Sequence, residues 1–167
     1  MVLHFARQEY DTRIQRALAS MDESGLDGLL MFRQESMYYL TGYDTMGFVM
    51  FQAMVLTGDG RMALLTRSPD LRQARYTSTL EDIRIWVDTD TADPYRELRD
   101  LADEMGLAGK RVGIELDACG LNASHWERLK PQLDDFCRLE DASDLVSRLR
   151  LVKSPAELAF MKNSAEL

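Results

Sequence analysis

The chain has 167 residues and a formal net charge of −8 at pH 7. Proteins that bind nucleic acid or anionic membranes normally carry a basic surface, so this charge argues against both kinds of partner. Apolar residues make up 46% of the sequence and charged residues 29%, which suffices for one ordinary globular domain.

Helical and strand periodicities alternate along most of the chain, which is the pattern of an α/β layered fold. In chain order, helices are predicted at residues 10–21, 68–76, 94–105, 123–133, 145–152 and 154–167. Short apolar runs predict strands at residues 26–32, 48–56, 61–66, 83–87, 111–116 and 136–139. The turn Thr57-Gly58-Asp59-Gly60 joins the second and third strands, which predicts a β-hairpin.

Several helix starts carry a side chain that can accept a hydrogen bond from the first turn. Ser68, Asp93 and Ser154 are each followed by proline, which suits the first helical position, and Asn122 precedes another helix. Glu157 lies three residues after Ser154, so this pair predicts a capping box.

Two helix-to-strand connections share the pattern Gly-Leu-x-Gly, at residues 25–28 and 106–109. We interpret them as one connection used twice, because glycine commonly ends a helix. The last predicted helix has no such glycine stop and continues to Leu167. We therefore predict a domain at residues 1–140 and junction helices at residues 141–167, and we interpret the unfinished helix as a truncation before a C-terminal domain.

The features that bear on location are the N-terminus, the apolar runs and the cysteines. Residues 1–9 lack the charged and apolar regions of a secretory signal, and no apolar run approaches the ~20 residues of a membrane span. Cys119 and Cys137 form no CxxC pair, so we expect buried or partly buried free thiols in a reducing compartment. Together these features predict a cytoplasmic protein without a membrane partner.

Few residues are candidates for metal binding. His4 and His125 are expected at the surface, because no HxxxH or HExxH spacing accompanies them. The loop with Asp88, Asp90 and Asp93 lacks the glycine and the terminal glutamate of an EF-hand, so we interpret it as a solvated loop whose last residue caps a helix.

Two further combinations could support catalysis. Glu115 and Asp117 flank the end of a predicted strand and share one side of it, where they could form a paired-carboxylate site. We favour a structural role, in which they accept backbone or arginine hydrogen bonds, because nothing else supplies an acid–base partner. A nucleophile–base pair of Cys119 and His125 is less favoured still. We assign no catalytic residue and no metal ligand.

The segment 38–51 is rich in aromatic residues and methionine, and it joins the first two predicted strands. It either folds back over the sheet with its rings in the core, or forms a surface loop whose apolar groups contact a partner or substrate. Composition does not separate these two interpretations.

Four short motifs resemble the N-terminal domains of Xaa-Pro peptidases, creatinase and ectoine hydrolase. They are Gln8-Glu9-Tyr10 with Arg13, Tyr39-Leu40-Thr41-Gly42-Tyr43, Arg111-Val112-Gly113-Ile114-Glu115 and Leu149-Arg150-Leu151-Val152-Lys153-Ser154-Pro155-Ala156-Glu157. Each motif is weak alone, but the four occur in the family order and span nearly the whole chain. Ser36 is a departure, since many relatives have asparagine there, although either side chain can close a turn.

The resemblance implies a three-layer α/β fold with a mixed sheet of about six strands flanked by helices, in the layout of ribonuclease H without its active site. Catalysis in this family lies in a C-terminal pita-bread domain. There, peptidases hold two divalent metal ions (Mn, Co or Zn), whereas creatinase uses no metal. The resemblance therefore implies that residues 1–167 bind no cofactor themselves.

For function, the resemblance implies a non-catalytic domain of a Xaa-Pro dipeptidase or aminopeptidase, which contributes to a homodimer and restricts access of short peptides. A loop of such a domain can extend toward the catalytic pocket of the partner subunit, and the segment 43–51 falls at that place. Tyr43, Asp44, Phe48 and Phe51 are the candidate substrate contacts. Aromatic faces suit a prolyl ring or methylated nitrogen, and a carboxylate suits an amine or guanidinium.

Other functions stay open. The parent protein could be a creatinase- or ectoine-hydrolase-like amidinohydrolase, with a small amide or amidine as its substrate. The chain could also be a stand-alone binding module, or an independent enzyme that uses Glu115, Asp117 or Cys119.

Overall fold

A computed structural model describes residues 3–166. In this range six strands form one mixed sheet in the order β4-β3-β2-β1-β5-β6. The strands are β1 (Gly28–Met31), β2 (Ala53–Thr57), β3 (Met62–Arg67), β4 (Asp82–Trp86), β5 (Arg111–Ile114) and β6 (Arg138–Asp141). Central β1 pairs antiparallel with β2 and parallel with β5, and the outer pairs β3–β4 and β5–β6 are also parallel.

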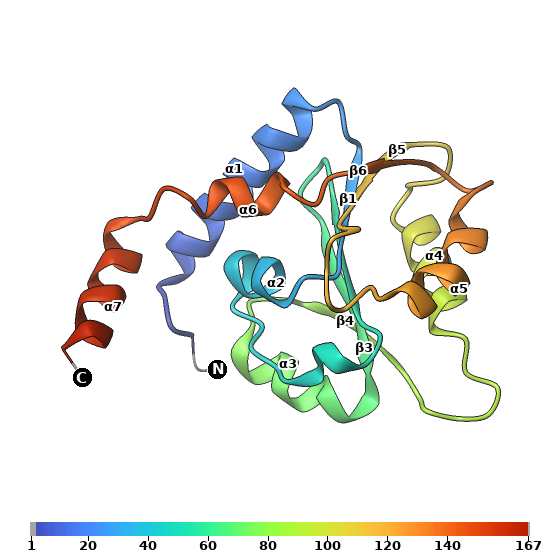
Figure 1. The fold of residues 1–167 in the computed structure, drawn as a ribbon, viewed down its shortest axis with the longest axis horizontal. Helices are drawn as coiled ribbons and strands as arrows, with labels where there is room; N and C mark the ends of the chain where they lie inside the picture. Colours follow the sequence, from blue (N-terminus) through green and yellow to red (C-terminus); the bar gives the residue numbers. More distant parts are fainter. Residues whose placement is uncertain (1–2, 167) are drawn as a thin grey trace.

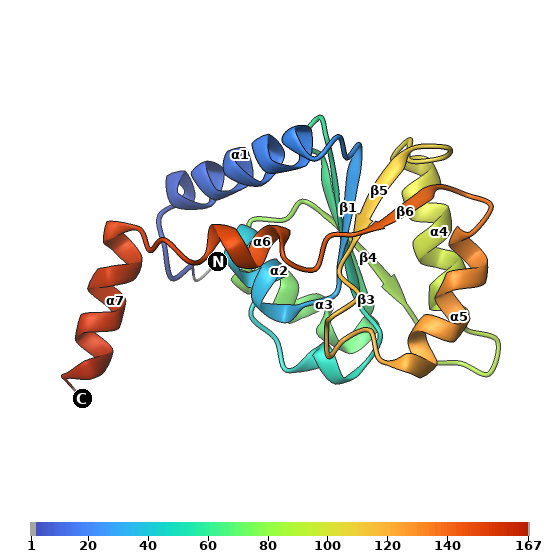
Figure 2. The ribbon, with the colours of Figure 1, turned by 45° about the horizontal axis from the view of Figure 1, so that its top comes forward.

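Helices cover both faces of the sheet. They are α1 (Arg7–Glu23), α2 (Gln34–Thr41), α3 (Leu71–Thr77), α4 (Pro94–Glu104), α5 (Ala123–Leu133), α6 (Leu145–Leu149) and α7 (Pro155–Ala165), with 3-10 turns η1 (Gly47–Val49) and η2 (Ser68–Asp70). Helices α4 and α5 lie on one face, α1, α2, α3 and α6 lie on the other, and α7 stands apart from both (Figures 1 and 2). The expected three-layer fold with a mixed six-stranded sheet is confirmed.

The central strands are apolar on both sides because both faces are covered. Every residue of β1 and β2 is buried. Leu30 and Val55 belong to the core cluster under α4 and α5, whereas their neighbours Leu29 and Met54 belong to the cluster under α1 and α2. Strand alternation thus divides one apolar run between two cores.

The two Gly-Leu-x-Gly connections adopt the same geometry. Gly25 and Gly106 both have positive φ angles, +65° and +80°. The residue after each glycine donates its N–H to the carbonyl five residues before it, at 2.9 Å for Leu26 and 3.0 Å for Leu107. This bond is the signature of the Schellman motif, and it confirms that one connection is used twice.

Three of the four expected helix caps are present. Asp93, Asn122 and Ser154 each accept a backbone N–H of their helix, and Ser154 with Glu157 forms the complete capping box. The fourth prediction was wrong, because residues 68–70 form a separate 3-10 turn and α3 begins only at Leu71.

Some predicted element bounds need correction. Residues 34–41 form α2, whereas we expected the segment from residue 38 to be a loop. The second strand begins at Ala53 rather than at residue 48, because residues 47–49 form the turn η1. The last strand begins at Arg138, two residues after the predicted start. Helix α7 ends at Ala165, and Leu167 lies outside the described residues. No helix within residues 3–166 is long and apolar enough to cross a membrane.

Candidate functional site

Two of the four candidate contact residues, Tyr43 and Phe51, are core residues. Tyr43 is buried, and its hydroxyl donates to Gln52 Oε1 at 3.1 Å. Burial raises the pKa of Tyr43, so the phenol stays neutral. Phe51 is buried with its ring centroid 4.6 Å from that of Tyr95. For these two residues the first interpretation of the segment 38–51 is correct, because their rings pack into the core.

The other two candidates lie on a surface loop at residues 44–50, which we call the 44–50 loop. Asp44 is exposed and Phe48 is half-buried. The most exposed apolar side chains of the loop are Met46, at 77%, and Val49, at 69%. The second interpretation therefore holds for this part, and sequence reasoning missed its two most exposed members. Their high exposure depends on the turn at η1, which has no clear signal in the apolar run itself.

Helix α3 and turn η2 hold the 44–50 loop in place. The N–H of Asp44 donates to Thr77 Oγ1 at 3.1 Å, and Gln73 Nε2 donates to the carbonyl of Asp44 at 2.6 Å. Thr45 Oγ1 accepts the N–H of Gly47 at 2.8 Å and itself donates to Asp70 at 3.3 Å. The exposed methionine and valine thus sit on an anchored turn, so the loop presents a preformed apolar tip.

Glu115 occupies the place where β1 and β5, two parallel neighbours, both end. Its side chain is fully buried, at 0% exposure. One carboxylate oxygen accepts the N–H groups of Phe32 at 3.0 Å and Arg33 at 2.8 Å, and the other accepts the Ser36 hydroxyl. These donors lie at the start of α2, so Glu115 caps that helix from a distant strand.

This position is where open α/β sheets commonly bind ligands, at the carboxyl ends of parallel strands. Here a carboxylate of the chain itself takes the place of an anionic ligand. Asp117, the other candidate in the pair, is 95% exposed and lies 3.5 Å from Arg33 in an ion pair. The two carboxylates are therefore in different environments, and the structural interpretation of Glu115 is confirmed.

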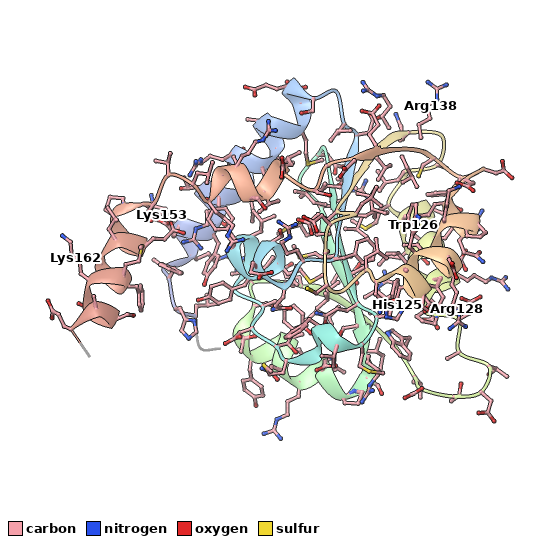
Figure 3. The ribbon with its side chains drawn as sticks, in the orientation of Figure 1. His125, Trp126, Arg128, Arg138, Lys153 and Lys162 are labelled. Atoms are coloured by element: carbon pink, nitrogen blue, oxygen red, sulfur yellow. The ribbon has the colours of Figure 1, made fainter. Side chains whose placement is uncertain are left out.

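His125 lies on α5 beside Trp126 and Arg128, on the far side of the molecule from Lys153 and Lys162 (Figure 3). It is half-buried rather than a free surface residue, and its Nδ1 is 2.8 Å from the Tyr95 hydroxyl. Burial, and to a lesser extent the Arg128 charge, lower its pKa, so the imidazole is held neutral. These contacts describe a structural histidine.

The remaining candidates are dispersed. His4 Nδ1 contacts the Tyr38 hydroxyl at 2.7 Å. Cys119 is exposed, contrary to expectation, because it lies in the loop after β5, whereas Cys137 is buried and burial raises its pKa to about 11. Asp93 caps α4, as expected for the acidic loop.

No group of three or more histidine, cysteine, aspartate or glutamate side chains within residues 3–166 is arranged to hold a metal ion. A dinuclear metal centre needs several such ligands that converge on one point. The described residues of this domain therefore do not fit a dinuclear metal site of the kind that the resemblance implies for the C-terminal domain of the parent protein. We assign no metal to this domain.

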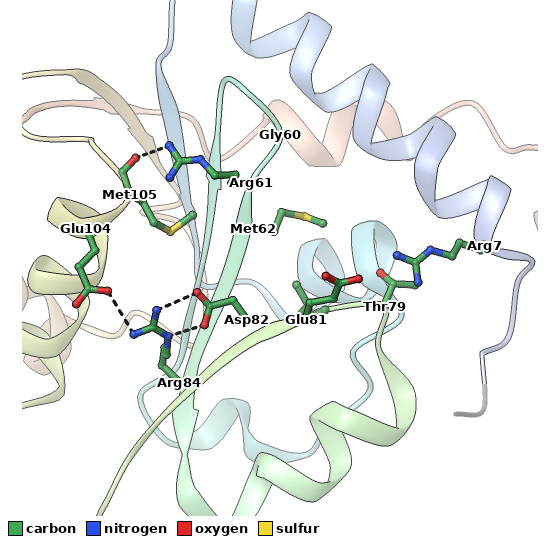
Figure 4. A pocket seen from close by; sticks show the side chains of 11 residues that line it. Arg7, Gly60, Arg61, Met62, Thr79, Glu81, Asp82, Arg84, Glu104 and Met105 are labelled. Carbon is green, nitrogen blue, oxygen red and sulfur yellow. Dashed lines mark hydrogen bonds and ion pairs between the residues drawn. The ribbon is translucent and has the colours of Figure 1, made fainter.

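A charged pocket of about 500 Å³ opens between the start of β4, the start of α1 and the end of α4 (Figure 4). Arg84 on its wall pairs with Asp82 and with Glu104, and Arg61 donates to the carbonyl of Met105 at 3.0 Å. Arg61 also pairs with Asp59 at 2.9 Å. The lining holds three arginines and three carboxylates, which gives the pocket little net preference for an anion.

Sequence comparison identifies similar proteins. The family model for the creatinase/prolidase N-terminal domain matches residues 13–152. An uncharacterized hydrolase/peptidase of Sinorhizobium fredii is 31% identical over 98% of the chain, and the ectoine hydrolase of Halomonas elongata is 27% identical over 99%. The chain spans 43% of the length of each of these two relatives.

Structure comparison finds the same fold in solved proteins. The prolidase of Thermococcus sibiricus has a TM-score of 0.79 and 22% identity, over 94% of this chain and 41% of the prolidase. At this identity the likeness establishes the fold alone.

We predict that Glu115→Ala destabilises the chain by at least about 3 kcal/mol, because each unsatisfied buried donor costs about 1–3 kcal/mol. Glu115→Gln should cost less than about 1.5 kcal/mol, since the amide oxygen can accept both N–H groups while the amide nitrogen donates to Ser36. Urea unfolding of the three proteins measures both effects. Equal losses for the two variants would contradict the capping role.

The pH dependence of stability gives a second prediction. Burial raises the pKa of Glu115, and the hydrogen bonds from Ser36, Arg33 and Phe32 offset this only in part. The native state therefore binds a proton at Glu115 more readily than the unfolded state does. The contribution of this proton binding to the free energy of unfolding is lost as pH rises through the folded-state pKa of Glu115. The stability of the native sequence relative to Glu115→Gln should fall as pH rises from the ordinary range of glutamate pKa values. A rise in relative stability over that range would contradict this.

Proposed function

The chain belongs to the creatinase/prolidase N-terminal domain family, and we propose that it is the non-catalytic N-terminal domain of a hydrolase of the Xaa-Pro dipeptidase or aminopeptidase type. The family match over residues 13–152, in a chain that spans 43% of the length of its relatives, supports this proposal most directly. The catalytic domain would follow the junction helices, for which we retain residues 141–167, and the protein would be cytoplasmic.

The proposed substrate is a short peptide with a prolyl or similarly blocked C–N bond. In the parent protein, the catalytic domain would supply the metal-binding side chains that the described residues of this domain lack as a group. A creatinase- or ectoine-hydrolase-like activity on a small amide or amidine is the second candidate. The 27% identity with the ectoine hydrolase of Halomonas elongata favours keeping it.

The proposed role of this domain is to contribute to a homodimer and to restrict access to the active site. The anchored 44–50 loop supports this role, because it exposes the apolar side chains of Met46 and Val49 without a packing function of their own. Within it, Asp44 and Phe48 are accessible for a substrate contact. Tyr43 and Phe51 would act from beneath, by supporting the loop.

We expect the 167-residue chain alone to hydrolyse neither Xaa-Pro dipeptides nor ectoine nor creatine, because it lacks the proposed catalytic domain. The parent protein should cleave one of these substrates, and loss of activity on chelation would identify the peptidase type. Turnover by the isolated chain would favour an independent enzyme. If the gene that encodes the chain specifies no catalytic domain, the stand-alone module would be favoured instead. Product analysis by mass spectrometry distinguishes the substrates.

Substitutions in the 44–50 loop test the access role. In the parent protein, Asp44→Asn should raise KM by about ten- to a hundredfold if the carboxylate binds a substrate amine, since a charged hydrogen bond contributes about 1.5–3 kcal/mol. Met46→Ser with Val49→Ser should weaken dimerisation, measured by analytical ultracentrifugation. Val87→Ser, at another exposed apolar position, directly after the edge strand β4, is the control.

Each of these variants should change the unfolding free energy of the 167-residue chain by less than about 0.5 kcal/mol, because the side chains are exposed. Unchanged KM and unchanged dimerisation in the parent protein would show that the loop has only a structural role.

A further inference from the structure

Helix α7 stands apart from the layered body (Figure 2). One ion pair, between Arg13 and Glu157, links it to α1. We propose that Arg13 of α1 is a latch that holds Glu157 of α7 and thereby sets the direction in which the chain leaves the domain. The proposal concerns contacts within this chain, so it goes beyond the proposed function and does not depend on it.

The guanidinium of Arg13 is buried, with only 2% of the side chain exposed. It donates to the carbonyl of Tyr39 at 3.1 Å and lies 3.3 Å from Glu9. Its carbon atom is 4.2 Å from the ring centroid of Phe5 and 4.6 Å from that of Tyr39. These groups come from α1, from the segment before it and from α2, so the body of the domain holds the arginine rigidly.

The remaining amino group of Arg13 faces α7. It lies 3.2 Å from Glu157 Oε1, an ion pair without the alignment of a hydrogen bond. Glu9 pairs with Arg13 at Nε, and Glu157 is the carboxylate that faces the buried Nη2 group, which has no hydrogen bond. A buried cationic group without a partner is costly, so the free energy favours conformations in which Glu157 stays at this place. The Phe5 and Phe160 rings, with centroids 5.0 Å apart, add a second contact beside the ion pair.

Glu157 has two roles in this arrangement. Its other oxygen, Oε2, accepts the N–H of Ser154 at 2.8 Å and closes the capping box at the start of α7. One carboxylate therefore both begins the helix and ties that beginning to α1. The direction of the helix axis is coupled to the position of Arg13 through this single side chain.

The chain before α7 is suited to act as a hinge. Residues 151–153 are exposed and connect α6 to α7. The end of α6 is held separately, because Arg16, one turn after Arg13, donates to the carbonyl of Leu149 at 3.2 Å. The described side chains of α7 are exposed or half-buried throughout. When the ion pair opens, α7 can rotate about residues 151–153 while α6 and the sheet stay in place.

The test measures the orientation of α7 in the 167-residue chain. Spin labels are attached at Gln15→Cys on α1 and Lys162→Cys on α7, both exposed positions, in a Cys119→Ser background that removes the exposed native thiol. Pulsed electron paramagnetic resonance spectroscopy then reports the distribution of distances between the two labels. Hydrogen exchange of the α7 amides gives an independent readout.

Glu157→Gln is the central variant, because glutamine keeps the capping box but removes the charge that Arg13 binds. We expect the distance distribution to broaden at least twofold. We also expect the α7 amides to exchange roughly tenfold faster, as in a locally opened segment, while the exchange rates of the β1 and β2 amides stay unchanged. A distribution as narrow as that of the native sequence would overturn the proposal.

Ser154→Ala is the matched control. It weakens the cap but keeps the Arg13–Glu157 pair, so it should leave the distribution narrow. Equal broadening in both variants would mean that the cap, and not the latch, sets the orientation. Arg13→Met should reproduce the broadening of Glu157→Gln, and the double variant should add nothing further. If Arg13→Met unfolds the domain, Glu157→Gln still decides the matter, since Glu157 lies outside the core clusters.

Discussion

The buried carboxylate of Glu115 is the constraint on which the centre of the fold depends. It joins the end of β5 to the end of β1 and to the start of α2 through three hydrogen bonds. These bonds lie at the carboxyl ends of two parallel strands, which is where open α/β sheets usually bind a ligand. The 44–50 loop lies apart from these bonds, on the surface that α3 and η2 anchor.

Sequence patterns predicted the elements whose signals are local, and they failed where the signal is distant. Helix α1, the hairpin and the caps at Asp93, Asn122 and Ser154 follow from neighbouring residues. Helix α2 was missed because its cap, Glu115, lies 82 residues from Arg33. Its end did carry a local signal, since Gly42 has a φ of +82° and stops the helix. In the segment 43–51, the presence of aromatic residues could not show which of them point into the core, because their orientation depends on the positions of η1 and α3.

The four family motifs correspond to contacts rather than to separate features. The motif that ends in Glu115 meets the helix that carries part of the Tyr39–Tyr43 motif, through a hydrogen bond from Ser36. The first motif meets the last, through Arg13 and Glu157. Residues near the two ends of the sequence are thus neighbours in space.

The distant cap of α2 has a consequence for synthesis on the ribosome. The β2–β3 hairpin can pair as soon as residues 53–67 have left the exit tunnel, because its contacts are local. Strand β1 can then join this hairpin through its antiparallel pairing with β2, whereas its other edge must wait for β5 and α2 must wait for Glu115, until residue 115 has emerged. Until then one edge of β1 has unpaired backbone groups and α2 lacks the hydrogen bonds to Glu115, so the nascent chain exposes a strand edge in the middle of its future sheet.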